Sequence, residues 1–341
     1  MTLDSALVCT CAFLCPALLT GVVRRLALAR GLMDVPNARS SHAIPTPRGG
    51  GIAIVAGAAG ALVALFISGK IDTHLFLALT GGGLAVAGVG FIDDRRPLSA
   101  RVRLAVHIAA AVWALVWLGG APALHIPGPI VLARAVSYVL SGLGIVWVLN
   151  LYNFMDGIDG LAASEAVFVA LGSAFLLLLA GGSPGVAAAS AAFGAACLGF
   201  LGWNWPPAKI FMGDVGSGYI GYTIAVLALA AARDQSSLLA VWLILSGLFI
   251  IDATVTLVRR LFRGEKVYSA HRSHAYQWLA RRWKSHKSVT VLAVGINLLW
   301  LLPWSWAAAT NPTRVIWIMA VAYVPLTILA LAAGAGRAEA V

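Results

Sequence analysis

Long apolar stretches constrain this chain more than any other feature. Eleven segments of roughly 20 mainly apolar residues are suited to cross a lipid bilayer as helices. They lie near residues 5–28, 51–69, 75–91, 104–120, 135–150, 161–180, 186–202, 215–231, 237–258, 288–308 and 315–333. Because 60% of the residues are hydrophobic and only 11% are charged, the chain has more apolar surface than a water-soluble core needs. The sequence therefore predicts an all-α, polytopic membrane protein with about eleven transmembrane helices, built as a single integral membrane domain over residues 1–341.

The positive charges indicate how the chain crosses the membrane. If the N-terminus lies outside, all but four of the 24 Lys and Arg residues fall on the inner side; the exceptions are Lys70, Arg134, Arg233 and Arg314. Since cytoplasmic loops are enriched in Lys and Arg, the N-terminus is predicted to be periplasmic and the C-terminus cytoplasmic. The net charge of +11 is scattered through these loops. This distribution favours membrane lipids and small anionic ligands as partners, and no nucleic acid.

Polar sequence gathers on the predicted inner face. The inner loops are 30–50, 92–103, 151–160, 203–214 and 259–287, whereas the outer loops are short and chemically plain. Transporters usually place ionisable groups within the membrane, on a route that joins both sides. An enzyme that works at the cytoplasmic surface is therefore favoured, and a lipid flippase or transporter is the alternative from another class.

Two adjacent aspartates, Asp93 and Asp94, stand where an apolar stretch ends, in the segment FIDDRRPLSARVRL. Two neighbouring carboxylates are costly to desolvate unless a cation or several hydrogen-bond donors lie nearby. A bound divalent metal ion is one explanation. The alternative is a solvated pair that Arg95 and Arg96 neutralise.

The segment NLYNFMDGIDGLA repeats polar residues at every third position, namely Asn150, Asn153, Asp156 and Asp159. On an unbroken helix these side chains would sweep through about half a turn and could not share one site. Gly157 and Gly160 are therefore expected to end the helix and to let the backbone approach a ligand. Ordinary turn chemistry is the alternative explanation.

The segment NWPPAKIFMGDVGSG places Asp214 in a glycine-flanked turn just before the next apolar stretch. An aspartate at this position could simply cap a helix. Phe211 offers a flat apolar face for a base to stack on, and the glycines and the helix start could meet phosphate with backbone N–H groups. These features favour a nucleotide site.

A basic inner loop follows Asp252, which lies near the inner end of an apolar stretch, where an ionisable residue is a functional candidate. The loop carries potential phosphate donors, namely Arg259, Arg260, Arg263, His271, Arg272 and His274. A loop that only obeys the charge rule for cytoplasmic segments is the alternative. The apolar spacing over residues 276–283 predicts a short helix in the membrane interface.

A proline-rich inner loop, MDVPNARSSHAIPTPRGGG, supplies Arg39, His42 and Arg48. Their donors suit a phosphate contact, and anchoring at the membrane surface explains the loop equally well. The remaining histidines are His74, His107, His125 and His286, and none of them belongs to a recognisable constellation of polar residues, except that His107 lies one turn beyond Arg103.

Together, these motifs resemble those of the polyprenyl-phosphate N-acetylhexosamine-1-phosphate transferases, glycosyltransferase family 4. FIDDRRPLSARVRL is similar to the family's Asp-Asp motif, NLYNFMDGIDGLA to its Asn-x-x-Asn-x-x-Asp-Gly-x-Asp-Gly motif, and PAKIFMGDVGS to its Pro-Ala-x-x-Phe-Met-Gly-Asp motif. Together with the proline-rich and basic inner loops, these motifs follow the order of the family over residues 34–277. Several branches carry a His-x-His-His cluster where this chain reads HRSHAYQ. This variant resembles the branch that starts O-antigen chains with FucNAc or QuiNAc, and lipid I synthase is an alternative.

The resemblance implies the transfer of N-acetylhexosamine-1-phosphate from a UDP-sugar to undecaprenyl phosphate, with UMP as the second product. It implies a catalytic set of Asp93, Asp94, Asp214 and His274, with Mg²⁺, or alternatively Mn²⁺, held by the first three. The implied substrate-binding residues are Asn150, Asn153, Asp156, Asp159, Asn204, Phe211, Arg272, His271, Arg39, Arg48 and Arg103. Phe211 would stack on the uracil. Direct attack by the lipid phosphate, positioned by Asp93, and a covalent aspartyl intermediate are both open.

The resemblance also implies a location and an assembly. The protein would lie in the bacterial inner membrane with its active site on the cytoplasmic face, where it would initiate O-antigen or another cell-surface polysaccharide. Its partners would be undecaprenyl phosphate, a UDP-N-acetylhexosamine, membrane lipids and, in one arrangement, a second copy of the chain as a homodimer.

Overall fold

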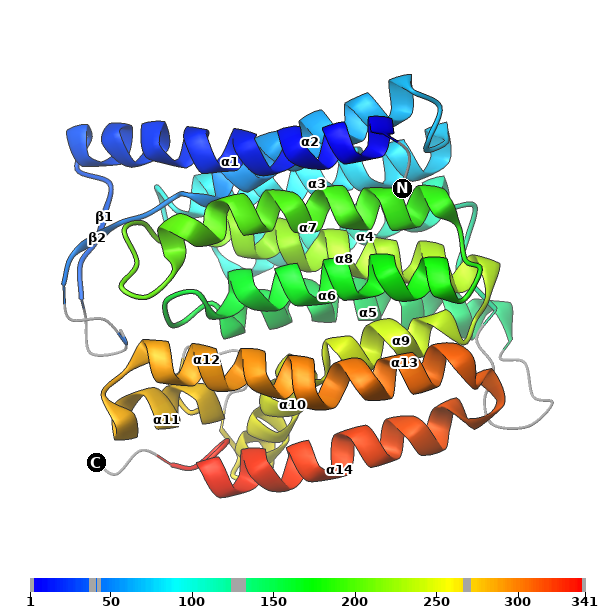
Figure 1. The fold of residues 1–341 in the computed structure, drawn as a ribbon. Coiled ribbons are helices and arrows are strands. Elements are labelled where there is room, and N and C mark those ends of the chain that lie inside the picture. The colour runs from blue at the N-terminus through cyan, green and yellow to red at the C-terminus, as the bar shows by residue number, and fades with distance from the viewer. Residues whose placement is uncertain (1–2, 37–40, 42–43, 124–132, 266–270, 339–341) are drawn as a thin grey trace.

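The fold is a bundle of helices of similar length that run roughly alongside one another (Figure 1). The structure, a computed structural model, describes residues 3–36, 41, 44–123, 133–265 and 271–338. Its helices are α1 Leu3–Ala29, α2 Gly51–Ile67, α3 Thr73–Asp93, α4 Ala100–Trp117, α5 Arg134–Met155, α6 Leu161–Leu179, α7 Pro184–Asn204, α8 Asp214–Asp234, α9 Leu238–Leu245, α10 Gly247–Phe262, α11 Ala275–Trp283, α12 His286–Ile296, α13 Leu302–Thr310 and α14 Val315–Ala333. A π-helical turn, Asn297–Leu301, joins α12 to α13, and a 3-10 turn, Pro312–Arg314, precedes α14.

Each apolar stretch that the sequence marks coincides with helix, so the polytopic, essentially all-α architecture is confirmed. Within the described residues, nine helices are long and apolar enough to cross a membrane, and a bent pair raises this to ten. A further apolar helix, α2, has 17 residues. Among the described residues, the β-structure is a pair of two-residue strands, β1 Met33–Asp34 and β2 Thr46–Pro47, which lie antiparallel. The count of eleven spans and the sidedness of the termini stay predictions.

The stretch predicted as one span over residues 237–258 is broken. It forms α9 and α10, whose axes differ by 70°. The break falls at Ser246 and Gly247, and a Gly/Ser pair is a common cause of sharp kinks. The predicted span over residues 237–258 is therefore divided into two helices at this break.

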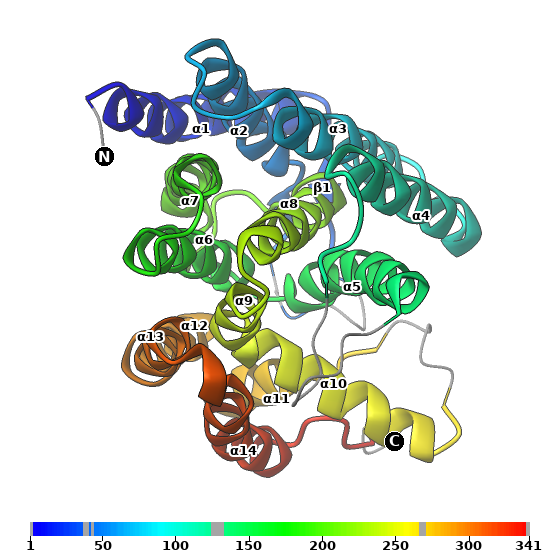
Figure 2. The same cartoon turned by 90° about the vertical axis from the view of Figure 1, so that its right-hand side faces the viewer.

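Helix α8 occupies the centre of the bundle, with α3, α5 and α7 among its neighbours (Figure 2). Its side chains from Val215 to Ala232 are all buried. Small residues permit this close packing: a Cβ on Gly221 would lie 2.6 Å from the Cα of Leu149 in α5. Tight contact through glycine is typical of helices that associate within a membrane.

The outer helices expose large apolar side chains. Leu18, Ile67, Val116 and Trp317 are each more than 60% exposed. A water-soluble protein rarely exposes so much apolar surface, because that surface must be covered by a partner or by lipid. The polar loops instead gather at one end of the bundle, with β1, β2, α11 and the start of α12, while α1 begins at the opposite end (Figure 1).

Candidate functional site

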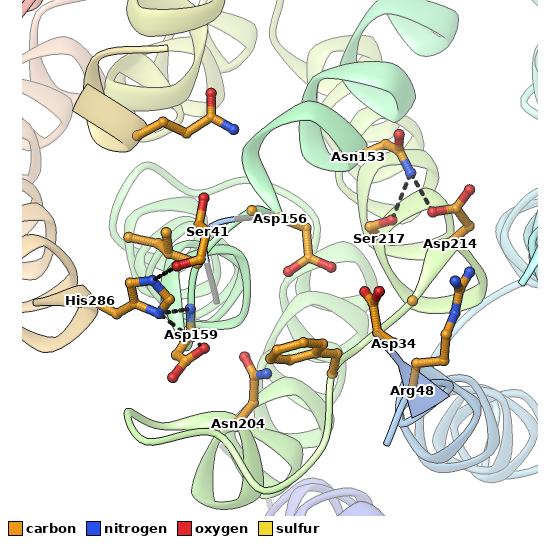
Figure 3. A pocket seen from close by; sticks show the side chains of 15 residues that line it. Asp34, Ser41, Arg48, Asn153, Asp156, Asp159, Asn204, Asp214, Ser217 and His286 are labelled. Carbon is orange, nitrogen blue, oxygen red and sulfur yellow. Dashed lines mark hydrogen bonds and ion pairs between the residues drawn. The ribbon is translucent and has the colours of Figure 1, made fainter. Parts of the chain in front are cut away.

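A cavity of about 270 Å³ opens at the end of the bundle where the polar loops meet (Figure 3). Its walls come from segments far apart in the sequence: the loop that contains β1 and β2, the loops after α5 and α7, and the starts of α8 and α12. The lining residues are Asp34, Ser41, Arg48, Asn153, Asp156, Gly157, Ile158, Asp159, Asn204, Phe211, Gly213, Asp214, Ser217, Gln277 and His286. We refer to this cavity as the polar pocket.

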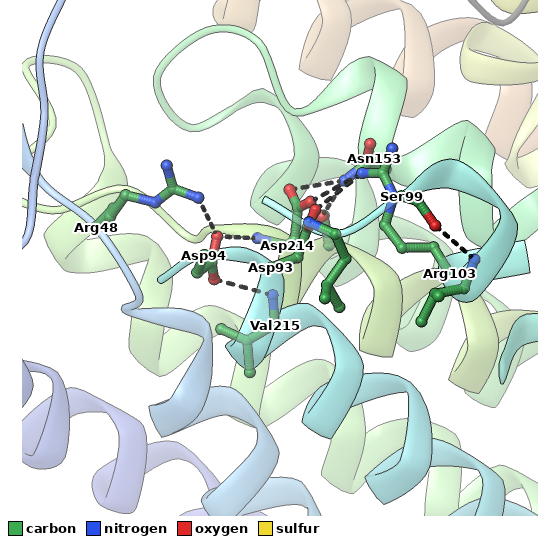
Figure 4. Close-up of polar contacts among 11 residues, drawn as sticks. Arg48, Asp93, Asp94, Ser99, Arg103, Asn153, Asp214 and Val215 are labelled. Carbon is green, nitrogen blue, oxygen red and sulfur yellow. Dashed lines mark hydrogen bonds and ion pairs between the residues drawn. The ribbon is translucent and has the colours of Figure 1, made fainter. Parts of the chain in front are cut away.

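Asp94 fixes the start of α8 beside the end of α3 (Figure 4). Its carboxylate accepts hydrogen bonds from the backbone N–H groups of Asp214, at 2.9 Å, and Val215, at 3.2 Å. Arg48 donates to the same carboxylate at 2.5 Å. The first N–H groups of a helix have no partner within the helix, so an aspartate that accepts from them stabilises the helix start. Asp94 therefore holds Asp214 in place.

Asp93 points to a different set of partners. It accepts from the backbone N–H of Leu98 at 2.6 Å and from Arg103 at 2.9 Å. Arg103 also lies 3.6 Å from Asp214. One explanation offered from the sequence is that neighbouring arginines neutralise the two aspartates. Arginines do pair with them, but the partners are Arg48 and Arg103. Arg95, which the sequence suggested, lies over the ring of Phe91 instead.

Asn153 completes the environment of Asp214. Its side-chain amide donates to Asp214 at 2.9 Å and to the hydroxyl of Ser217 at 3.2 Å. Ser217 lies one turn after Asp214 on α8, so the Asn153 amide contacts two consecutive turns of the helix. The spacing of the NLYNFMDGIDGLA motif therefore brings Asn153 to Asp214, although the two residues are far apart in sequence.

The polar pocket contains charges of both signs, and these charges shift the pKa values of Arg48 and Asp156. Burial lowers the pKa of Arg48, but the hydrogen bond to Asp94 and the negative charges of Asp94, Asp214 and Asp34 outweigh it, and the net pKa is raised. Loss of hydration raises the pKa of Asp156 well above its usual value, and the charges of Asp214, Asp94 and Asp159 raise it further. A positive partner would therefore stabilise the charged form of Asp156.

The loop after α5 turns as the glycines of its motif predict. Helix α5 ends at Met155, and Gly160 adopts a φ of +73° immediately before α6. An L-residue with a side chain rarely adopts this conformation. The backbone N–H of Gly160 donates to Asn204 at 3.0 Å, and the Asn204 amide donates to the carbonyl of Ile210 at 3.0 Å. Asn204 thus ties the loop after α5 to the loop after α7.

Asp159 meets His286, the first residue of α12. The Asp159 carboxylate lies 3.1 Å from His286 Nδ1 and accepts from the backbone N–H of Ala208 at 3.0 Å. His286 Nε2 lies 2.9 Å from the carbonyl oxygen of Ser41. The interpretation that His286 has no polar constellation around it is therefore wrong, because the fold brings two distant loops to this ring.

His274 does not line the polar pocket, and its catalytic role stays a prediction. The residue precedes α11 and is only 2% exposed. The His274 ring is stacked against the rings of His271, Tyr276 and Phe154. Asp252 accepts from the backbone N–H groups of Ala275 and Tyr276 and thereby caps α11. This part of the motif shapes the protein next to the pocket.

Five other predicted binding residues also lie outside the lining of the polar pocket or outside the described residues, and one of them, Arg103, pairs with Asp93 as described above. Asn150 donates to the carbonyl of Val146 in its own helix. His271 contacts the hydroxyl of Ser273, and burial, followed by the charges of His274 and Arg260, lowers its pKa to about 4. The carbonyl of Arg272 accepts from Arg281. Arg39, with its neighbour His42, lies outside the described residues.

The short helix predicted over residues 276–283 is present as α11. Its side chains Tyr276 and Ala280 are buried within the protein, and the Tyr276 hydroxyl donates to the carbonyl of Phe154 at 2.9 Å. A helix that only rests on the membrane surface would direct this face to lipid. The structure therefore favours a role in shaping the pocket wall.

The donors of the polar pocket fit a divalent cation, but not through the predicted trio. Among the described residues no group of three or more His, Cys, Asp or Glu side chains could hold a metal ion. Asp93 and Asp94 are engaged by arginines and backbone amides. Asp156 and Asp214 both point into the pocket (Figure 3), and no described residue donates a hydrogen bond to the Asp156 carboxylate. Since Mg²⁺ often binds one or two carboxylates together with substrate phosphates, these two would be its ligands.

Several lining residues were not predicted from the sequence. Ser217 and Gln277 lie inside the motifs that were recognised, and Ser217 could have been found because it follows Asp214 by one helical turn. Asp34 is an acid within an otherwise basic inner loop, which is a weak signal. Ser41 and His286 carry no local signal, because their position depends on how distant loops meet.

The comparisons with known proteins agree with this geometry. The sequence profile of Glycosyl transferase family 4 matches residues 76–232. A probable undecaprenyl-phosphate N-acetylglucosaminyl 1-phosphate transferase of Bacillus subtilis is 31% identical, over 81% of this chain and 77% of that protein. A decaprenyl-phosphate N-acetylglucosaminephosphotransferase of Mycobacterium tuberculosis is 36% identical, over 80% of this chain and 75% of that protein.

A third relative, an undecaprenyl-phosphate alpha-N-acetylglucosaminyl 1-phosphate transferase of Yersinia pestis, is 30% identical, over 80% of this chain and 75% of that protein. The similarity thus extends through most of each protein, and the profile match over residues 76–232 includes the loops after α5 and α7 and the start of α8. The chain belongs to glycosyltransferase family 4, among the polyprenyl-phosphate N-acetylhexosamine-1-phosphate transferases.

Proposed function

We propose that this protein transfers an N-acetylhexosamine-1-phosphate from a UDP-sugar to undecaprenyl phosphate at the cytoplasmic face of a bacterial inner membrane. The products would be undecaprenyl-diphospho-sugar and UMP. The observation that carries the proposal is the polar pocket, in which Arg48, Asp156 and Asp214 face one cavity at the end of a membrane-spanning bundle. The named activities of the relatives support the same reaction.

The arginines address the main obstacle of this reaction, which is the approach of two anions. The second pKa of a phosphate monoester is about 6, so the acceptor is largely a dianion at neutral pH and needs little help from a general base. Arg48 and Arg103 are held by Asp94 and Asp93, respectively. Fixed guanidinium groups bind phosphate oxygens without reorganisation, so they favour the crowded, negatively charged transition state.

In the direct reaction, an oxygen of the lipid phosphate attacks the β-phosphorus of the UDP-sugar. The bond from this phosphorus to the bridging oxygen breaks, and UMP leaves with the electron pair. A divalent cation bound by Asp156 and Asp214 would supply further charge neutralisation at the phosphates. Asp93 would act through Arg103, rather than by touching the acceptor itself.

The nucleoside end of the donor is proposed to lie near Phe211, Asn204 and Asp159. Phe211 lines the pocket and provides an aromatic surface on which a base can stack. The relatives are named for N-acetylglucosamine, whereas the HRSHAYQ segment resembles the FucNAc/QuiNAc branch. We propose a UDP-N-acetylhexosamine as the donor and initiation of a cell-surface polysaccharide such as O-antigen as the outcome.

The test is a defined reaction with purified protein in detergent. Undecaprenyl phosphate and Mg²⁺ are mixed in turn with UDP-GlcNAc, UDP-GalNAc, UDP-FucNAc and UDP-QuiNAc, and UMP and the lipid product are measured by chromatography. We expect one donor to yield both products in equal amounts, with no reaction in EDTA or without the lipid. If no donor yields UMP while proteoliposomes move a polyprenyl lipid between leaflets, the transporter alternative replaces this proposal.

A further inference from the structure

His286 and Asp159 form a contact that the reaction described above does not use. The two side chains are 18% and 12% exposed, respectively, and both line the polar pocket. They come from elements 127 residues apart in the sequence. A partly buried contact between an imidazole and a carboxylate at the rim of a ligand pocket therefore calls for an explanation in terms of the ligand.

The partners of His286 define its hydrogen bonds. A carbonyl oxygen can only accept, so His286 Nε2, at 2.9 Å from the Ser41 carbonyl, carries a proton. On the other side, Nδ1 lies 3.1 Å from the Asp159 carboxylate and 3.5 Å from the Asp159 backbone nitrogen. In the neutral ring, Nδ1 accepts from the Asp159 backbone N–H. In the protonated ring, Nδ1 donates to the Asp159 carboxylate. His286 thus bridges Asp159 and the first inner loop with both ring nitrogens.

Helix α12 holds Asp159 at a second point. Thr290 lies one turn after His286, and its hydroxyl donates to the Asp159 carbonyl at 2.8 Å. Residues four apart lie on the same face of a helix. The face of α12 that carries His286 and Thr290 therefore holds both the side chain and the backbone of Asp159, while Ala208 holds the second carboxylate oxygen.

We infer that His286 is a positioning residue for the donor nucleotide, which acts by orienting Asp159 toward the base end of the polar pocket. This inference rests on the proposed function. An oriented carboxylate can accept a hydrogen bond from an N–H of a pyrimidine ring that stacks on Phe211. Without His286, the Asp159 side chain loses a partner that fixes its rotamer.

The test separates an effect through Asp159 from a general loss of structure. In His286→Gln, we expect KM for the UDP-sugar to rise about tenfold, since a hydrogen bond to a charged group is lost, while kcat and KM for undecaprenyl phosphate change less than about twofold. Asp159→Asn should raise KM for the UDP-sugar at least as much. In the double variant, the His286→Gln change should add less than about twofold to the effect of Asp159→Asn.

A milder variant and a matched control complete the experiment. Thr290→Val keeps the side-chain shape and removes only the hydroxyl bond to Asp159, so it should raise KM for the UDP-sugar two- to threefold. His74→Gln removes a histidine that also contacts a carbonyl, that of Trp117, away from the polar pocket, and it should leave KM unchanged.

Effects of His286→Gln and Asp159→Asn that multiply would overturn the inference, because His286 would then act independently of Asp159. An unchanged KM in His286→Gln would overturn it as well. In both cases the wild-type reaction still stands. An inactive wild-type protein would instead remove the proposed function.

Discussion

The two ends of the polar pocket are built on different principles. At the α8 end, formed by Arg48, Asn153, Asp214 and Ser217, arginine charges compensate the carboxylates of Asp93, Asp94 and Asp214. At the α12 end, formed by Ser41, Asp159, Gln277 and His286, a histidine joins one carboxylate to a backbone carbonyl. The α8 end thus combines several opposite charges, whereas the α12 end is held by directed hydrogen bonds. The difference suggests that phosphates bind at the α8 end and that the base is recognised at the α12 end.

Asp214→Asn tests this division most severely. The side chain keeps its size and its contact with Asn153, but the negative charge at the start of α8 is lost. We expect kcat to fall by at least about a hundredfold, as is typical when an electrostatic element of a transition state is removed, with the protein still folded in detergent. UMP release measures turnover, and size-exclusion chromatography monitors folding.

Asp4→Asn is the matched control for this variant, because Asp4 is an exposed aspartate in the first turn of α1, at the opposite end of the bundle. It should retain full turnover. Near-wild-type activity of Asp214→Asn would show that the α8 end does not carry the charge chemistry.

Gly90→Ala tests whether the α8 end depends on close contact between α3 and α8. A Cβ on Gly90 would lie 2.5 Å from the carbonyl oxygen of Asp214, so the helices must move apart. We expect a loss of about 1–3 kcal/mol in the free energy of unfolding, as for other overpacked sites, and a tenfold or larger fall in kcat.

The control lies two residues away on the same helix. Gly88 has open space around its Cβ position, so Gly88→Ala should keep activity and gain up to about 1 kcal/mol from helix propensity. If both variants behave alike, the contact at Gly90 does not position Asp214. Thermal unfolding and UMP release provide the two measurements.

Asp156→Asn gives the smallest change in stability and probes the region between the two ends. The pKa of Asp156 is raised in the folded protein, so between its unfolded value, near 3.9, and the raised value the folded state binds a proton that the unfolded state has released. The stability of the wild type therefore falls as pH rises through this window. In EDTA at pH 8, we expect Asp156→Asn to unfold a few degrees above the wild type, while its turnover is strongly reduced.

This gain should shrink toward pH 4, where both forms are neutral at this position. A gain that is independent of pH would point to packing rather than to charge. No gain at any pH would mean that the pocket stabilises the Asp156 carboxylate without a cation, which would remove the argument for Asp156 as a metal ligand.

The sequence was sufficient to predict the helical segments, because a membrane imposes a simple requirement on length and apolarity. It could not predict the break between α9 and α10, since Ser246 and Gly247 also occur in straight helices. It likewise could not predict which of Arg48, Arg95, Arg96 and Arg103 would pair with the two aspartates. That choice depends on the path of the chain after α3, where Arg95 turns back over Phe91.

For the site, residues within compact motifs could be predicted, whereas contacts between distant loops could not. Asn153, Asp156 and Asp214 lie in compact motifs, so their convergence could be inferred. His274 and His286 show the opposite case. The first belongs to a dense motif yet is buried beside the pocket, and the second lies at the α11–α12 turn, outside the recognised motifs, yet lines the pocket. Local residue density is therefore a guide to polar regions, but contact across distant loops depends on tertiary structure.

The burial of α8 on every side has a mechanical consequence. Changes in bilayer thickness or lateral pressure act first on helices that touch lipid, and α8 is shielded from lipid by its neighbours. Asp214 stands at the start of this shielded rod. The pocket residues at this end should therefore keep their spacing when the cell remodels its lipids, which would insulate the proposed transfer from the state of the membrane.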